Sequence, residues 1–277
     1  MKNLKRPVNS LLKAAKIVET FTSQEHELGA SEMARKVSLP RPTVHRLMST
    51  LAQIHWLEWD ESKKKYGIGP ELYMIGNLYV ENKSILTRIE PVAEMLNELS
   101  KESVVAAIFD HANVMEIMRI DARYEPRFIL PTSRLRIAHV TSVGKALLSE
   151  LSESEIDSLF PDENLMQRTK KTIKTKSELK RELEKIRKSG ISYDDEENWD
   201  GFAGIASLVR DSSGKGILAM SIGIPVFRLN GVEARENLTT LVRKCCDLAS
   251  YRLGYRDSRR HIRSLQEIRS WWHKKCN

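Results

Sequence analysis

Apolar residues recur at helical spacing from Asn9 onward and divide the first seventy residues into short elements. The first expected helix carries one apolar face: Leu11, Ala14, Ala15, Val18 and Phe21. After a polar break, a second helix begins at Ser31 and turns three apolar residues inward: Met33, Ala34 and Val37. Pro40 ends that segment, because proline disfavours helical backbone in the residue before it. A third helix then starts with Pro42 in its first turn, where no backbone N–H is needed.

This third helix has an apolar stripe and a polar outward face. The stripe is formed by Val44, Leu47, Met48 and Leu51. Two short helices joined by a tight turn, behind a longer first helix, are typical of a helix-turn-helix. Its outward face carries the side chains that a recognition helix presents to DNA: Arg41, Thr43, His45, Arg46, Ser49 and Thr50. An ordinary three-helix subdomain with a solvated polar face is the alternative.

Two alternating segments, 56–59 and 65–68, follow this helix and predict a hairpin, the wing of a winged helix-turn-helix over residues 9–68. Three lysines at its turn are placed to meet phosphates: Lys63, Lys64 and Lys65.

Helical spacing continues over residues 70–100 and predicts a linker helix, then the first helix of a second domain, with Pro91 in a first turn. From Ser103 the period changes to two, and segments 104–109 and 114–120 form a predicted hairpin. Later elements are helices and strands. Helices are expected after Ser152, from near Ser177, and over the apolar stripe that runs from Leu238 to Ala249, and strands over 205–210 and 217–224. Hairpins mixed with helices, without regular β-α-β alternation, predict an α+β domain with an antiparallel sheet.

The length and charge of the chain fit two domains. At 277 residues it is long enough to bury two cores. Net charge is +4 over residues 1–80, −2 over 81–251 and +6 over 252–277, so a polyanionic partner would contact the ends. The sequence shows no membrane-spanning apolar run, no signal peptide and no disulfide framework. We therefore expect a cytoplasmic protein without membrane contact.

Catalytic signals are missing from the sequence. Its seven histidines lack metal-ligand spacing. It contains no Gly-x-Ser-x-Gly elbow, phosphate-binding loop or dinucleotide fingerprint. We expect no catalytic residue, no metal and no cofactor, and hence a binding protein rather than an enzyme.

A small-ligand site is nevertheless expected in the second domain. Thr141 and Ser142 would cap a helix through 144–148, whose free N–H groups suit a carboxylate. One face of strand 218–223 is small and partly polar, which would leave space for a ligand. Asp194 follows a short strand-like segment and is placed to accept a hydrogen bond from a ligand hydroxyl.

Two segments, 39–48 and 65–69, resemble the DNA-reading head of the IclR family of bacterial regulators. Further stretches extend the resemblance over residues 9–254: 139–148, 190–197, 201–211 and 221–228. It implies a GAF-like effector-binding domain and assembly into a homodimer or a dimer of dimers. His55 stands just before the wing, where the family usually has glycine, so we expect a positive φ there.

The resemblance also implies six ligand-contacting positions: Ser142, Val143, Asp194, Gly204, Ser221 and Gly223. Gly223 replaces a polar residue of some members, which removes one hydrogen bond. The implied domains are a winged helix-turn-helix (1–69), a linker helix (70–84), a GAF-like effector-binding and oligomerisation domain (85–254) and a basic extension (255–277).

We therefore expect a DNA-binding transcriptional regulator whose affinity for a double-stranded operator is switched by a small organic acid. Two alternatives stay open: a DNA-binding protein whose second domain only oligomerises, and an enzyme with an accessory helix-turn-helix. The extension 255–277 is a predicted helix, packed on its own domain or a neighbouring subunit, or else an added phosphate contact. Repression or activation, the operator sequence and the effector's identity are left open.

Overall fold

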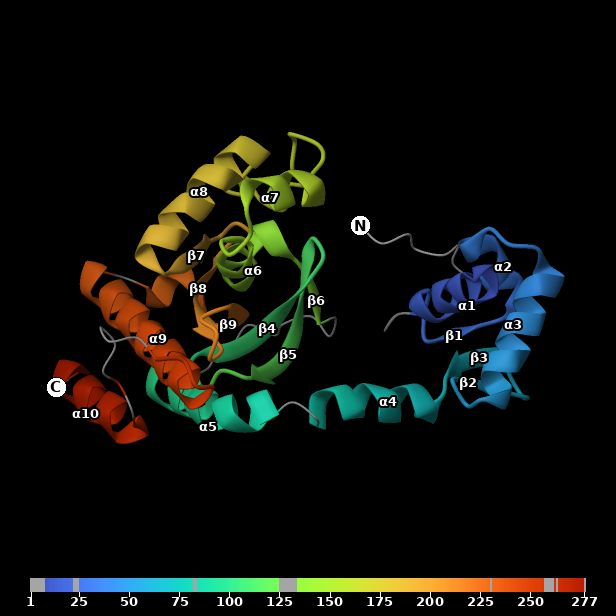
Figure 1. Cartoon of the computed structure of the whole chain (residues 1–277), viewed down its shortest axis with the longest axis horizontal. Helices are drawn as coiled ribbons and strands as arrows, with labels where there is room; N and C mark the ends of the chain where they lie inside the picture. Colours follow the sequence, from blue (N-terminus) through green and yellow to red (C-terminus); the bar gives the residue numbers. More distant parts are fainter. Residues whose placement is uncertain are drawn as a thin grey trace. The chain divides into compact units, whose positions relative to one another are not determined.

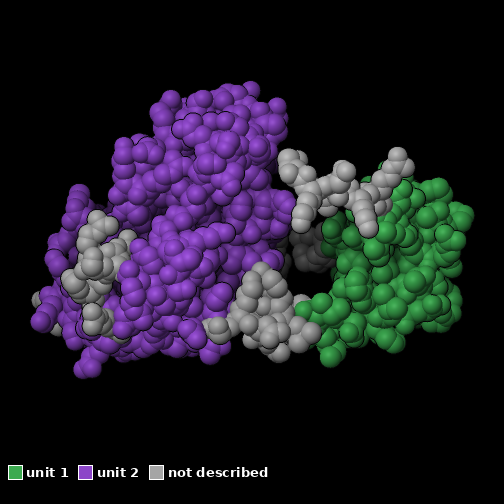
Figure 2. All heavy atoms as spheres, viewed as in Figure 1, with its two compact units in different colours: residues 1–83 green, residues 84–277 purple. Residues whose placement is uncertain are grey.

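The chain forms two compact units, residues 1–83 and 84–277 (Figure 2). The computed structural model describes residues 8–21, 25–81, 84–124, 134–229, 231–256, 262 and 264–276. Within this described part, no helix is both long and apolar enough to cross a membrane.

The first unit is three helices and a small antiparallel sheet with strand order β1-β3-β2. Its elements are α1 (Asn9–Glu19), β1 (Glu27–Leu28), α2 (Ala30–Val37), α3 (Arg41–Gln53), β2 (Leu57–Asp60), β3 (Lys65–Ile68) and α4 (Pro70–Glu81). The core gathers the inward faces of the three helices and of the hairpin: Ile17, Met33, Val37, Val44, Met48, Leu51, Leu57 and Tyr66. The two short helices and the hairpin therefore form where the sequence predicts them.

Two details of this unit differ from the sequence prediction. Leu11 was expected to face the core, but it is 68 % exposed, and Ile17 is buried instead. The apolar arc of α1 is wider than the surface that the small core covers. The segment expected to be a polar break contains β1, which pairs with Tyr66 and Gly67 of β3. Two residues are too few to show the alternation that reveals a strand.

His55 has a φ of 59°, the positive value expected just before the wing. The backbone there is tightly packed, because Gly69 donates its N–H to the carbonyl oxygen of Trp56 at 2.8 Å. A Cβ at Gly69 would lie 2.2 Å from the carbonyl oxygen of His55. The junction between α3 and the wing therefore requires glycine at 69 while it tolerates histidine at 55.

The second unit is built on a six-stranded antiparallel sheet, which confirms the predicted α+β fold. The spatial order is β6-β5-β4-β9-β8-β7. The strands are β4 (Ser103–Asp110), β5 (Asn113–Ile120), β6 (Leu135–Ile137), β7 (Ser192–Asp195), β8 (Phe202–Arg210) and β9 (Gly216–Pro225).

Helices cover both faces of this sheet and enclose two cores (Figure 1). One layer contains α5 (Ser84–Ser100), α9 (Val232–Arg252) and α10 (Leu265–Cys276), and the other α6 (Ser142–Leu148), α7 (Glu153–Leu159) and α8 (Lys176–Ser189). Alternate residues of β9 serve the two sides, as a half-buried strand requires. Met220 and Ile222 enter the core with α5 and α9, whereas Ala219 enters the core with α6 and α8.

Pro91 was expected in the first turn of a helix, but it lies inside α5. The helix continues through it because its neighbours Ile89, Val92 and Leu96 are fully buried in the core. That packing outweighs the one backbone hydrogen bond that proline removes. The helix expected to begin near Ser177 is capped earlier, since the hydroxyl of Thr175 accepts the N–H of Glu178 at 3.1 Å.

The C-terminal extension contributes α10, which packs against α9 and α5 of its own unit. Ile268 of this helix is fully buried in the same core as those two helices. Arg269 forms a two-point ion pair with Glu98 of α5, with Nη1–Oε1 at 2.9 Å and Nη2–Oε2 at 2.5 Å. Lys244 of α9 places its ammonium 5.1 Å from the ring centre of Trp271. Helix α10 is thus an integral part of the helical layer.

We expect Ile268→Ala to lower the free energy of unfolding of the second unit by about 2–5 kcal/mol, because it leaves a cavity in the core. Urea unfolding followed by circular dichroism measures this change. Lys275→Ala, an exposed change in the same helix, is the control and should stay within about 0.5 kcal/mol of wild type. Equal stability of the two variants would show that α10 does not pack in solution as described.

Candidate functional site

Helix α3 presents a polar face to solvent while its apolar face is held in the core of the first unit. Of the six predicted reading positions, four are exposed: Arg41, His45, Arg46 and Thr50. Thr43 and Ser49 are half-buried at the edges of this face. The hydroxyl of Thr50 donates to the carbonyl oxygen of Arg46 at 2.9 Å, so its oxygen is left to accept. A rigid helix with an exposed row of polar and basic side chains is what major-groove reading needs.

The three lysines of the wing surround the turn between β2 and β3, but none of them is without a partner. Each pairs with an acidic residue of its own unit: Lys63 with Glu27 at 2.7 Å, Lys64 with Glu61, and Lys65 with Glu32 at 3.6 Å. Exposed pairs of this kind contribute only about 0–1 kcal/mol, so a phosphate can displace the carboxylate. A wing lysine that binds a DNA phosphate therefore exchanges its carboxylate partner for the phosphate.

A pocket lies in the second unit between the start of α6 and one face of the sheet. Its volume is about 60 Å³. All six candidate effector positions line it: Ser142, Val143, Asp194, Gly204, Ser221 and Gly223. Residues from α6, β7, β8 and β9 thus meet at one site.

The start of α6 forms one wall of this pocket. Thr141 caps the helix, since its hydroxyl accepts the N–H of Gly144 at 3.1 Å, and Ser142 is the first helical residue. The helix approaches its own preceding turn closely, because a Cβ at Gly144 would lie 2.0 Å from the carbonyl oxygen of Ala138. The capping prediction is confirmed for Thr141.

The space above the two pocket glycines is filled. At Gly223 this corrects the expectation that the small face of β9 leaves room for a ligand, whereas Ser221 of the same face does line the pocket. A Cβ at Gly204 would lie 2.5 Å from Oγ of Ser142. A Cβ at Gly223 would lie 2.7 Å from Cζ of Phe202. The room above each glycine is therefore filled by a side chain from a neighbouring element.

Asp194 is the buried carboxyl group of the pocket wall. Burial raises its pKa to about 7, because the charged form loses its hydration. The backbone N–H groups of Glu197 and Asn198 donate to its Oδ1 at 2.8 Å and 3.3 Å, and these bonds favour the ionised form. Near neutral pH, Asp194 can therefore either donate or accept a hydrogen bond.

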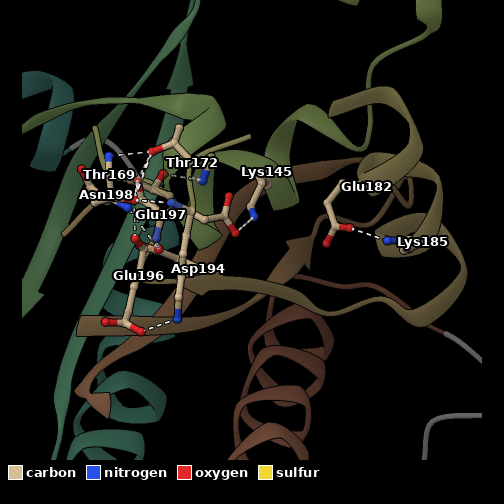
Figure 3. A network of polar contacts seen from close by, with 12 residues as sticks. Lys145, Thr169, Thr172, Glu182, Lys185, Asp194, Glu196, Glu197 and Asn198 are labelled. Atoms are coloured by element: carbon tan, nitrogen blue, oxygen red, sulfur yellow. Dashed lines mark hydrogen bonds and ion pairs between the residues drawn. The ribbon is translucent and has the colours of Figure 1, made fainter. Parts of the chain in front are cut away.

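Behind Asp194 lies a buried ion pair between Lys145 of α6 and Glu197 (Figure 3). Lys145 is only 1 % exposed, and burial raises the pKa of Glu197 although the Lys145 ammonium opposes that rise. The hydroxyl of Thr172 donates to the carbonyl oxygen of Glu197 at 2.6 Å. These contacts fix the loop that follows β7, and with it the position of Asp194.

Two charged residues on the opposite wall were not among the predicted site residues. Glu116 is 4 % exposed and pairs with Nε of Arg136 at 3.1 Å and Nε of Arg119 at 2.9 Å. The guanidinium of Arg136 lies 5.7 Å from the ring centre of Trp199. The other additional lining residues are Ser103, Val105, Thr141, Asn198, Trp199, Phe202 and Ile222. A glutamate inside the apolar segment 114–120 was a signal for this wall, whereas β6, which carries Arg136, is too short to predict.

Among the residues that the structure describes, no group of three or more His, Cys, Asp and Glu side chains is placed to hold a metal ion. Cys245 and Cys246 are free thiols buried in α9, and burial raises the pKa of both.

We expect Asp194 to make the stability of the second unit fall as pH rises from about 4 to about 7, because its pKa is about 7 in the folded chain and 3.8 as its ordinary value. In that window the folded state binds the proton and the unfolded state does not, so folding weakens by up to about 1.4 kcal/mol per pH unit. Asp194→Asn keeps an acceptor for the two N–H groups and should remove this component. Urea unfolding at several pH values compares the two proteins, and identical pH slopes would contradict the assignment.

A helix-turn-helix and an α+β unit with a pocket, carried by one chain, are the parts of a ligand-responsive DNA-binding regulator. Two family models match this chain: the IclR helix-turn-helix domain over residues 10–61, and the bacterial transcriptional regulator IclR C-terminal domain over residues 77–251. The chain belongs to the IclR family of bacterial transcriptional regulators. This membership confirms the prediction of a DNA-binding transcriptional regulator rather than an enzyme.

Curated relatives and solved structures agree with this assignment. The transcriptional repressor IclR of Escherichia coli K12 is 28 % identical over 231 residues, which cover 83 % of this chain and 84 % of the relative. The repressor AllR of the same organism is 30 % identical over 199 residues, which cover 72 % and 73 %.

Two solved structures share the fold. A putative IclR regulator from Silicibacter sp. TM1040 has a TM-score of 0.80 at 19 % identity, covering 89 % of this chain and 97 % of its own. An IclR homologue from Microbacterium hydrocarbonoxydans, solved with 4-hydroxybenzoate, has a TM-score of 0.75 at 21 % identity, covering 88 % and 98 %.

Proposed function

We propose that this regulator binds a double-stranded operator through α3 and that a small organic acid, bound in the pocket of the second unit, changes its operator affinity. The observation that carries the effector half is the convergence of six predicted positions from four elements on one pocket that contains a buried carboxyl group. We further propose that the protein acts in the cytoplasm as a homodimer or a dimer of dimers.

In the DNA half of the proposal, α3 reads base edges with its exposed polar face. Arg46 and His45 lie in the middle of this face, and Arg41 lies at its N-terminal end. An arginine can bind guanine through two hydrogen bonds, the commonest specific contact between a side chain and a base. The wing lysines contact phosphates by exchanging their acidic partners, and they therefore add less affinity than their number suggests.

In the effector half, the pocket offers groups that complement a carboxylic acid. Ser142 and Ser221 supply hydroxyls from two sides, and the guanidinium of Arg136, which is paired with Glu116, supplies N–H donors on the opposite wall. Asp194 donates a hydrogen bond when it is protonated, and it repels an anion when it is ionised. Acid binding should therefore strengthen as pH falls below about 7, the pKa of Asp194. The similar Microbacterium protein holds a carboxylic acid, which supports this ligand class.

We expect Arg46→Ala to weaken operator binding by about tenfold to a hundredfold, because one good base contact contributes about 1–3 kcal/mol. The operator is first selected with the wild-type protein from a pool of random duplexes, and fluorescence anisotropy at fixed salt then gives the dissociation constants. Lys188→Ala also removes one exposed positive charge, but in α8 of the second unit, and it serves as the matched control. Wild-type affinity in a folded Arg46→Ala protein would contradict the role of α3.

We expect at least one small organic acid to raise the melting temperature of the wild-type protein and to shift its operator affinity. Ser221→Ala should weaken binding of that acid by about fivefold, because it removes one hydrogen bond worth about 1 kcal/mol. Ser213→Ala, in an exposed turn, is the control. A broad panel of acids that neither stabilises the protein nor alters DNA binding would favour the alternative in which the second unit only oligomerises.

A further inference from the structure

The ring of Phe202 occupies one end of the pocket. Phe202 opens β8 and is 6 % exposed. Its ring lies against the backbone of Gly223, because a Cβ built there would be 2.7 Å from Cζ and 3.0 Å from Cε1. Any side chain at position 223 would therefore collide with the ring. The glycine of β9 is what allows a phenylalanine at 202.

The ring of Phe202 is held in place from the side as well as from below. Trp199 meets it edge to face, with ring centres 6.5 Å apart and planes at 72°. Trp199 in turn lies under the guanidinium of Arg136, which pairs with the buried carboxylate of Glu116. Rotation of Phe202 out of the pocket would disturb this whole row, so its ring acts as a fixed wall.

The remaining pocket is small: its volume is about 60 Å³, which is room for about four to six water-sized groups. Six polar side chains line it together with apolar ones, and the polar ones are Glu116, Arg136, Ser142, Asp194, Asn198 and Ser221. A phenyl ring on the ligand would need additional space of its own size. The space above Gly223 would supply it, but Phe202 already fills that space.

We propose that Phe202, seated on Gly223, sets the upper size limit of the effector, and that the pocket accepts a short carboxylic acid without a ring. This inference rests on the proposed function, and it narrows the effector from small organic acids in general to the short members of that class.

Paired acids that differ only by a phenyl group test the size limit directly. Isothermal titration of the full-length protein with acetate and phenylacetate, and with lactate and phenyllactate, should show binding of at least one short acid to wild type. The phenyl partner of that acid should bind wild type at least about tenfold more weakly. Phe202→Ala leaves an apolar cavity of the shape of a phenyl ring, and cavities of this kind bind benzene. The same phenyl acid should therefore bind Phe202→Ala at least about tenfold more tightly than it binds wild type.

Two further variants separate a wall from a merely structural residue. Gly223→Ala should push the ring into the pocket and weaken the short acid by about fivefold or more. In the Phe202→Ala background the same change should have little effect, because its clash partner is gone. Phe160→Ala is the control, because it removes a ring from the core beside His139 and not from the pocket. It should not strengthen the binding of a phenyl acid.

The outcomes distinguish this inference from the function on which it rests. Phenyl acids that bind wild type as tightly as the short acids would overturn the size limit and leave the effector function standing. The size limit would also be overturned if short acids bind wild type but phenyl acids bind a folded Phe202→Ala protein no more tightly than they bind wild type. If Phe202→Ala does not fold, Phe202→Leu replaces it and should give a smaller gain of the same sign. If none of the four acids binds wild type, and none binds Phe202→Ala or Phe202→Leu, the proposed function itself would be overturned.

Discussion

The alternation of side chains along β9 is the constraint on which the second unit depends. Successive residues of a strand point to opposite faces, so Met220 and Ile222 enter the core beneath α5 and α9 while Ser221 and Gly223 face α6. A slip of one residue would place a hydroxyl in the apolar core and large apolar side chains in the pocket. The pairing of β9 with β4 and β8 prevents that slip and therefore keeps Ser221 in the pocket.

Close approach of backbone and side chain shapes the site as much as its polar groups do. Gly204 admits the hydroxyl of Ser142, and Gly223 admits the ring of Phe202. Behind Asp194, the buried charge of Lys145 is paired with that of Glu197. Without this partner, Lys145 would be an uncompensated ion in the interior. Asp194 has no such partner at hydrogen-bond distance within the described chain except backbone N–H groups, and burial therefore keeps its proton near neutral pH.

Sequence periodicity was sufficient for the long elements and insufficient for the short ones. The stripes of α2 and α3 and the alternation of β9 are complete enough to reveal both element and face. The strands β1 and β6 have two and three residues, which show no period. The six pocket positions followed from family resemblance and strand alternation. The sequence did not predict Glu116, Arg136 and Phe202 as pocket residues. Their positions depend on which strands lie side by side and on the direction in which the ring of Phe202 points.

The helix that follows the family domain changes the mechanics of the layer it joins. Any movement of α5 against α9 must carry α10 along or break the burial of Ile268 and the pair between Arg269 and Glu98. A ligand can shift a conformational equilibrium only by its difference in affinity for the two states. An effector that moved α5 against α9 would therefore have to supply, in its difference in affinity for the two states, the free energy of these α10 contacts as well.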